Sequence, residues 1–304
     1  MEYVLRTYGL CKHYKGAPVV ADVSMNIRRG EIYGFVGKNG AGKTTLMRLV
    51  CGLIRKTGGS YELFGRTDTD PALDLSRRRV GSIIESPSLY PDMTAEDNLR
   101  EQSLVLGLRG AKFGGLLEYV GLADTGKKKV RNFSLGMRQR LGIAMALVGQ
   151  PDFIVLDEPV NGLDPQGIVE IRELLLRLNA EKGITVLISS HILGELSRLA
   201  TCYGFIDGGR LIREISAADL ESACRKSVRI TVDSTASVAC ALERGMGIED
   251  YRILSDTQAE IYGEVNVGEL AFALRDAGVS LLRVHERDED LEGYFLNLVG
   301  GEKC

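Results

Sequence analysis

The sequence predicts an α/β fold with a largely parallel sheet, followed by a smaller α+β domain. Two segments, Phe153–Leu156 and Thr185–Ser189, are dominated by Val, Ile and Leu. Such segments are typical of parallel strands that are covered on both faces. Strand-like segments alternate with amphipathic ones up to about residue 215. We therefore predict a first domain over residues 1–215.

The character of the sequence changes after residue 215. The stretches SVRITVD, AEIYGEV and VSLLRVHE alternate apolar and polar residues, as half-exposed strands do. Between the last two stretches, Val267, Leu270, Ala271 and Leu274 recur at helical spacing and predict one amphipathic helix. We predict a small α+β accessory domain over residues 216–304.

Composition excludes several classes of protein. The 304 residues carry a net charge of -3 and have no basic excess, so we expect no nucleic-acid partner. The start, MEYVLRTYGL, lacks a basic region followed by an apolar core, and no run of 18 apolar residues occurs. We therefore expect a cytoplasmic chain whose membrane role, if it has one, depends on a partner.

The stretch GKNGAGKTT, residues 37–45, predicts a phosphate-binding loop. It follows a strand-like segment and precedes a helical one, and it matches the pattern G-x-x-x-x-G-K-T. Its glycines let backbone amides approach phosphate oxygens, Lys43 can reach the β- and γ-phosphates, and Thr44 can bind Mg²⁺. We expect ATP and Mg²⁺ as cofactors and assign the following residues to nucleotide binding: Gly37, Asn39, Gly40, Gly42, Lys43, Thr44 and Thr45.

A second motif, FIVLDEP, supplies carboxylates at the end of an apolar strand. Asp157 follows the strand directly, and Glu158 is next to it. We predict that Asp157 holds Mg²⁺ and that Glu158 orients or deprotonates the attacking water.

The stretch NFSLGMRQR places Ser134 at the start of a helix, 23 residues before Asp157 (157 minus 134). Together with the two preceding motifs, it resembles the signature of ATP-binding subunits of ABC transporters. The resemblance covers residues 1–215 and implies the ABC type of P-loop NTPase fold, with a mixed central sheet and a helical signature subdomain. In that family the signature of one subunit, here Ser134 and Gly136, closes over the γ-phosphate in the cradle of another. We therefore expect a homodimer, or a paired ATPase subunit, with composite ATP sites.

Three further residues match the family's pattern. Asp164, in VNGLDP, is expected to reach across the dimer interface, and His191, in SSHIL, to contact the γ-phosphate as a catalytic residue. Tyr14, in CKHYKG, is expected to stack on adenine. A purely structural role for His191 and a core position for Tyr14 are the alternatives.

The chain departs from the family's common form in two places. The signature reads Phe-Ser-Leu-Gly-Met instead of Leu-Ser-Gly-Gly-Gln, and Glu85 stands where a Gln is usual. A Glu there resembles the bacitracin and lantibiotic export group, and we expect it to face Mg²⁺. The segment Pro87–Leu99 is then expected to contact the permease, or else to be a plain surface loop. The tail, including its ending DLEGYFLNLVGG, also resembles that group.

These observations predict an ATP-hydrolysing subunit that powers a separate membrane permease and exports an antimicrobial peptide or drug-like molecule. Such a subunit would lie peripherally on the inner face of the cell membrane. An importer ATPase is the nearest alternative, and a soluble ABC-type ATPase of metal-cluster assembly or DNA repair is a more distant one. A translation-factor type would be expected to carry two phosphate-binding loops, whereas this chain has one.

Overall fold

The computed structural model describes residues 2–224, 226–287, 293–294 and 298. It divides into two compact units, Met1–Ala217 and Ala218–Cys304. Of the ending DLEGYFLNLVGG, only residues 293, 294 and 298 lie among the described residues. In the part of the chain that is described, none of the helices combines the length and the apolar character that crossing a membrane requires.

The first unit is built on a six-stranded sheet, which confirms the predicted α/β fold. Its strand order is β11-β10-β4-β9-β8-β7, and every pair is parallel except β10 with β11. All residues of β4, β8 and β9 are buried, as expected for parallel strands covered on both faces. The strands are β4 (Ile32–Val36), β7 (Val80–Ile83), β8 (Phe153–Asp157), β9 (Thr185–Ser190), β10 (Cys202–Asp207) and β11 (Arg210–Ser216).

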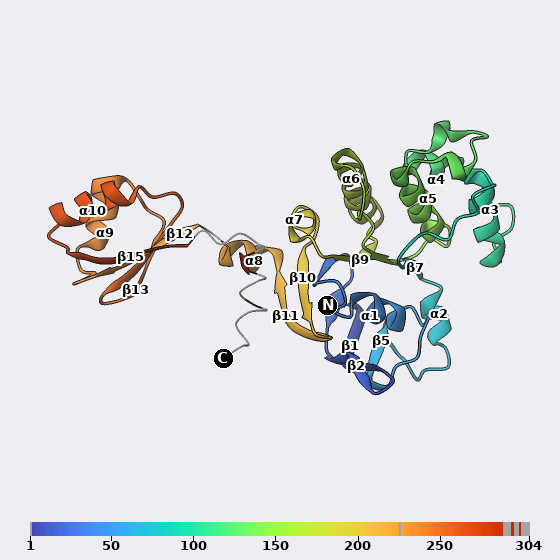
Figure 1. Ribbon diagram of the computed structural model, residues 1–304, viewed down its shortest axis with the longest axis horizontal. Coiled ribbons are helices and arrows are strands. Elements are labelled where there is room, and N and C mark those ends of the chain that lie inside the picture. Colours follow the sequence, from blue (N-terminus) through green and yellow to red (C-terminus); the bar gives the residue numbers. More distant parts are fainter. Residues whose placement is uncertain (1, 225, 288–292, 295–297, 299–304) are drawn as a thin grey trace. The chain divides into compact units, whose positions relative to one another are not determined.

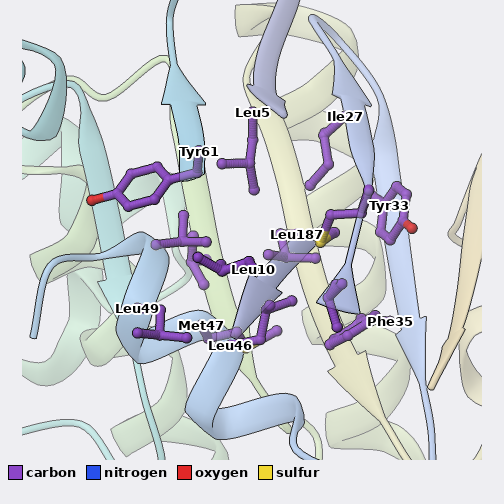
Figure 2. Close-up of a cluster of buried hydrophobic side chains, with 14 of the residues drawn as sticks. Leu5, Leu10, Ile27, Tyr33, Phe35, Leu46, Met47, Leu49, Tyr61 and Leu187 are labelled. Atoms are coloured by element: carbon purple, nitrogen blue, oxygen red, sulfur yellow. The ribbon is translucent and has the colours of Figure 1, made fainter. Parts of the chain in front are cut away.

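A second, antiparallel sheet packs against helix α1 (Lys43–Val50) and the central sheet (Figure 1). It consists of β1 (Tyr3–Tyr14), β2 (Ala17–Val23), β3 (Asn26–Arg28), β5 (Gly58–Leu63) and β6 (Arg66–Thr67). Figure 2 shows the core between these layers, in which Leu46 and Met47 of α1 lie among side chains from both sheets. Burying such a side chain contributes about 1.5–3 kcal/mol. The core therefore holds α1, the helix that follows the phosphate-binding loop.

Helices α3, α4 and α5 form a group of their own between β7 and β8 (Figure 1). Side chains at their first turns satisfy free backbone amides: Thr94 and Asp97 form a capping box at α3, and Ser134 caps α5. This group is the helical subdomain that the family resemblance implied. The helices of the first unit are α2 (Leu73–Arg77), α3 (Ala95–Val105), α4 (Gly114–Tyr119), α5 (Leu135–Leu147), α6 (Pro165–Lys182) and α7 (Leu193–Leu196), with 3-10 turns at Ala123–Thr125 and Val130–Asn132.

The second unit contains an antiparallel sheet of order β13-β14-β12-β15 with helices against it. Leu270 and Leu274 of α10 are fully buried, so the predicted helix face packs on the sheet. The elements are α8 (Ala217–Ala223), β12 (Ser227–Val232), α9 (Val238–Cys240), a π-helical turn (Ala241–Gly245), β13 (Tyr251–Ser255), β14 (Gln258–Tyr262), α10 (Val267–Asp276) and β15 (Leu281–Arg287).

One buried polar contact ties β4 to β11 within the first unit. The Tyr33 hydroxyl is on a fully buried side chain and donates a hydrogen bond to Glu214 Oε1 at 2.7 Å. Burial, together with the nearby Glu214 carboxylate, raises the pKa of Tyr33, so the hydroxyl keeps its proton. The neighbouring strand accommodates the ring through Gly204, where a Cβ would lie 2.1 Å from the Tyr33 hydroxyl.

Candidate nucleotide-binding site

The loop between β4 and α1 has a backbone that requires glycine. Gly40 and Gly42 have φ angles of 82° and 106°, which disfavour any residue with a Cβ. A Cβ on Gly37 would lie 2.5 Å from the Ile206 carbonyl oxygen, and one on Gly42 would lie 2.6 Å from that of Val19. The loop can therefore curl tightly and turn its amides toward a ligand at the N-terminus of α1, where the helix dipole favours an anion.

Lys43 supplies a cation at the base of this loop. Its side chain is only 5% exposed, and Nζ lies 2.5 Å from the Gly37 carbonyl oxygen and 3.3 Å from Glu158 Oε1. These contacts hold the ammonium group in place. The loop borders a pocket of about 160 Å³, lined by Val19, Lys38, Asn39, Gly40, Gly42, Lys43, Thr44, Thr45 and Glu158. The structure thus gathers most of the residues assigned to the phosphate-binding loop with Glu158.

Asp157 lies beside Thr44 at the end of β8. Thr44 Oγ1 donates a hydrogen bond to Asp157 Oδ2 at 2.6 Å. Ser189 Oγ donates another to Asp157 Oδ1 at 2.6 Å and accepts one from the Glu158 amide at 2.9 Å. Ser189 is fully buried. It therefore holds both carboxylate residues in place, and the sequence analysis did not single it out.

Besides Lys43, the Glu158 carboxylate has two hydrogen-bonding partners. His191 Nδ1 is 2.9 Å from Glu158 Oε2, and the Asn161 amide donates to the same oxygen at 3.3 Å. Glu158 has a φ of 46°, an uncommon conformation for a residue with a side chain. His191 is partly exposed, so it is not a core residue. Glu158 and His191, which the sequence predicted separately as catalytic residues, are in contact with each other, and Glu158 also lines the loop pocket.

Glu195 follows His191 by four residues and borders the same cluster. Its Oε2 accepts a hydrogen bond from Ser190 Oγ at 3.3 Å. Burial raises the pKa of the Glu195 carboxyl group. The sequence analysis missed this residue, and an acidic residue in a short helix offers no distinctive signal from which to find it.

The oxygen atoms of Thr44 and Asp157 suit a hard cation. The described residues contain no group of three or more His, Cys, Asp and Glu side chains that could hold a metal by themselves. Mg²⁺ is commonly bound by one or two protein oxygens, with water and nucleotide phosphates supplying the rest. The hydroxyl and carboxylate found here fit that pattern.

Glu85 is hydrogen-bonded to Arg48 and not to Thr44 or Asp157. Its Oε1 accepts a hydrogen bond from Arg48 Nη2 at 2.6 Å, and its side chain is 63% exposed. It is not among the residues that line the pocket at the loop. The structure therefore brings Thr44 and Asp157 together, whereas Glu85, the third predicted metal ligand, is paired with Arg48.

The signature residues line a different pocket. Ser134 Oγ accepts a hydrogen bond from the Met137 amide at 3.2 Å, and Asp164 Oδ1 accepts one from the Gly167 amide at 3.1 Å. These side chains cap α5 and α6, whose first turns meet at a pocket of about 420 Å³. It is lined by Ser134, Leu135, Gly136, Arg140, Gly162, Leu163, Asp164, Gln166, Gly167 and Glu170. The two pockets share no lining residue.

Tyr14 ends strand β1 and is 43% exposed. The Lys12 ammonium lies 4.9 Å from the centre of its ring. The β1–β2 hairpin pairs Tyr14 with Ala17, and β2 also supplies Val19 to the loop pocket. The alternative of a core position for Tyr14 is therefore wrong.

Comparisons with known proteins agree with this geometry. A family model described as ABC transporter matches residues 20–161. The bacitracin transport ATP-binding protein BcrA of Bacillus licheniformis is 38% identical over 99% of this chain and 99% of its own length. The lantibiotic transport ATP-binding protein SrtF of Streptococcus pyogenes is 44% identical over 69% of this chain and 90% of its own.

A solved structure with the same fold contains nucleotide products. The dimeric ATP-binding cassette MJ0796, bound to ADP and Pi, superposes with a TM-score of 0.63 at 27% identity over 70% of this chain and 98% of its own. The chain belongs to the ATP-binding proteins of ABC transporters. It is an ATPase of that type, and its fold binds ATP.

Ser189→Ala is expected to lower kcat about tenfold or more while changing KM less. The substitution removes a hydrogen bond to a charged group, about 1.5–3 kcal/mol, and leaves the Glu158 amide without its acceptor. Steady-state ATPase kinetics check this expectation. Ser190→Ala is the matched control, because the Ser190 hydroxyl is hydrogen-bonded to the Ile192 amide and the Glu195 carboxylate instead of to Asp157. Equal kcat values for the two variants would contradict a positioning role for Ser189.

Tyr14→Ala is expected to weaken ATP binding without slowing the chemical step. Stacking of a base on an aromatic ring contributes about 1–3 kcal/mol, or roughly five- to a hundredfold in affinity, and discriminates little between ATP and GTP. Equilibrium binding of a fluorescent ATP analogue measures the effect. Tyr8→Ala is the control, since Tyr8 is a similarly exposed ring on the same strand. An unchanged affinity in Tyr14→Ala would exclude stacking.

Proposed function

We propose that this chain powers a separate membrane permease and drives the export of an antimicrobial peptide or similar molecule. The observation that carries the proposal is the 38% identity to a bacitracin transport protein over nearly the full length of both chains. The similarity includes the second unit, which a match to the ATPase unit alone would not cover. A lantibiotic transport protein is similar over the first unit.

We further propose that two ATPase subunits form the catalytic assembly, either as a homodimer or with a paired subunit. The loop pocket carries Lys43 and Glu158, whereas Ser134 and Asp164 line another pocket. A second copy would bring its Ser134 pocket over the phosphates held by the first. The dimeric form of a related cassette supports this arrangement.

Within such a composite site, each residue has a distinct task. Loop amides and Lys43 bind the β- and γ-phosphates, while Thr44 and Asp157 hold Mg²⁺. Bound Mg²⁺ offsets phosphate charge. Glu158 lies where it can orient or deprotonate water, and His191, 2.9 Å from its carboxylate, fixes that side chain.

A groove between the helical subdomain and β7 is the proposed contact for the permease. It has a volume of about 430 Å³, and Val105, one of its lining residues, is 80% exposed. Pro87 also lines it and packs against Gly142, where a Cβ would lie 2.6 Å from the Pro87 ring. The groove overlaps the segment Pro87–Leu99, which the sequence analysis assigned to this role. Its lining includes Leu53, Ile83, Ile84, Ser86, Pro87, Tyr90, Val105, Leu106, Gly142 and Met145.

Glu158→Gln is expected to bind ATP, hydrolyse it slowly and accumulate as a dimer. A general base contributes on the order of 10²–10⁴ in rate, and the amide keeps the shape of the carboxylate. Size-exclusion chromatography with ATP and a turnover assay measure the two effects.

The control for this variant is Glu181→Gln, at the far end of α6, where Glu181 bonds to Tyr119. It is expected to behave like the parent chain. A Glu158→Gln chain that stays monomeric with ATP and keeps turnover within a few-fold of the parent would contradict both the base and the composite site.

Co-expression with its partner permease is expected to protect a sensitive bacterium against bacitracin-like or lantibiotic peptides. Protection requires ATP hydrolysis, so Glu158→Gln expressed with the same permease should abolish it. Minimal inhibitory concentrations measure the outcome. Greater sensitivity instead of protection would favour an importer, and failure of any membrane protein to co-purify would favour a soluble ATPase.

A further inference from the structure

Arg48 and Glu85 form an ion pair next to the phosphate-binding loop. Arg48 lies in the last turn of α1, the helix that begins at Lys43, and its Nη2 is 2.6 Å from Glu85 Oε1. Both side chains are partly exposed, at 35% and 63%. The pair therefore links the loop's own helix to the segment that follows β7.

The register of the sheet brings Glu85 to the same edge as the catalytic carboxylates. Ile83, at the end of β7, pairs with Leu156 in β8, and Asp157 comes next. Glu85 has a φ of 69°, a conformation that few residues other than glycine adopt. Its chain neighbours Ile84 and Ser86 line the groove between the helical subdomain and β7.

A cation beside Glu85 would offset the negative charges gathered at this edge of the sheet. The site already contains the carboxylates of Asp157 and Glu158, and bound ATP adds phosphate charge. Lys43 is 3.3 Å from Glu158, so its charge already faces another acid. Arg48 is the cation that contacts the Glu85 carboxylate.

We propose that Arg48 is a positioning residue that competes with Mg²⁺ for the Glu85 carboxylate. The inference rests on the proposed function and on the expectation from the sequence that Glu85 faces Mg²⁺ when Mg²⁺ is bound. While Arg48 holds the carboxylate, its negative charge is offset and directed away from the phosphates. When Mg²⁺ is bound with ATP, the Glu85 carboxylate would leave Arg48 to help hold the metal. A Glu at this position therefore depends on Arg48, whereas an uncharged Gln would not.

The experiment measures the binding of a fluorescent N-methylanthraniloyl derivative of ATP to the full chain across a Mg²⁺ titration, starting in EDTA. Arg48→Gln is expected to lower the half-saturating Mg²⁺ concentration about two- to fivefold, the range that an exposed ion pair supplies. It should also weaken binding in EDTA, because Glu85 then repels the phosphates. Arg48→Lys keeps the charge and should resemble the parent.

A double-mutant cycle separates this role from a general effect of charge. In the Glu85→Gln background, Arg48→Gln should no longer change the Mg²⁺ dependence. Arg66→Gln is the matched control, because Arg66 pairs with Asp70 at the surface. Arg48→Met, which keeps an apolar stem without charge, replaces Arg48→Gln if that variant does not fold, and the same shift is expected.

Three results would overturn the inference. If Arg48→Gln has the same effect in both backgrounds, Arg48 acts only on the C-terminal dipole of α1. If the parent binds the nucleotide and Arg48→Gln leaves its Mg²⁺ dependence unchanged, the inference fails while the proposed function stands. A parent that binds no nucleotide at any Mg²⁺ concentration would overturn both.

Discussion

The parallel pairing of β4, β9, β8 and β7 is the constraint on which the site depends. In a parallel sheet the carboxyl ends of the strands meet at one edge, where ligands of such folds bind. The register pairs Val36 with Ser190 and Asp157 with Ser189. The phosphate-binding loop, the carboxylates of Asp157 and Glu158, and His191 therefore all lie at this edge. A slip of one residue would turn Ser189 to the opposite face and leave Asp157 and the Glu158 amide without their shared partner.

At the same edge, one continuous segment of backbone runs from the nucleotide-binding site to the helical subdomain. The segment that leaves β7 contributes Glu85 to the ion pair with Arg48 and, one residue later, Ser86 to the groove. Pro87 then packs against Gly142 of α5, where a Cβ would not fit. The groove wall and the Glu85 carboxylate are thus only a few covalent bonds apart. Because Pro87 is packed tightly against Gly142, the segment after β7 can move little relative to α5.

Much of the fold and part of the site could be predicted from the sequence, because those signals are local. The glycines around Lys43 and the acids after an apolar strand are recognisable within a few residues. Ser189 and Arg48 were missed because their partners lie 32 and 37 positions away. Such contacts depend on strand register and on the face of a helix. The exposure of Tyr14 was equally undecided, since an aromatic residue at a strand end suits a core or a surface.

The contact between Tyr33 and Glu214 has a consequence for where this chain can be divided. The hydroxyl lies on the buried strand that leads into the phosphate-binding loop, yet its acceptor comes from the last strand of the first unit. A shortened fragment that ended before Glu214 would bury that hydroxyl without an acceptor, at a cost of about 1–3 kcal/mol. If the C-terminal units of related proteins are exchanged, the junction must therefore lie in a short stretch after Glu214 and close to Ala217. A junction upstream of this stretch would lower the stability of the ATPase unit itself.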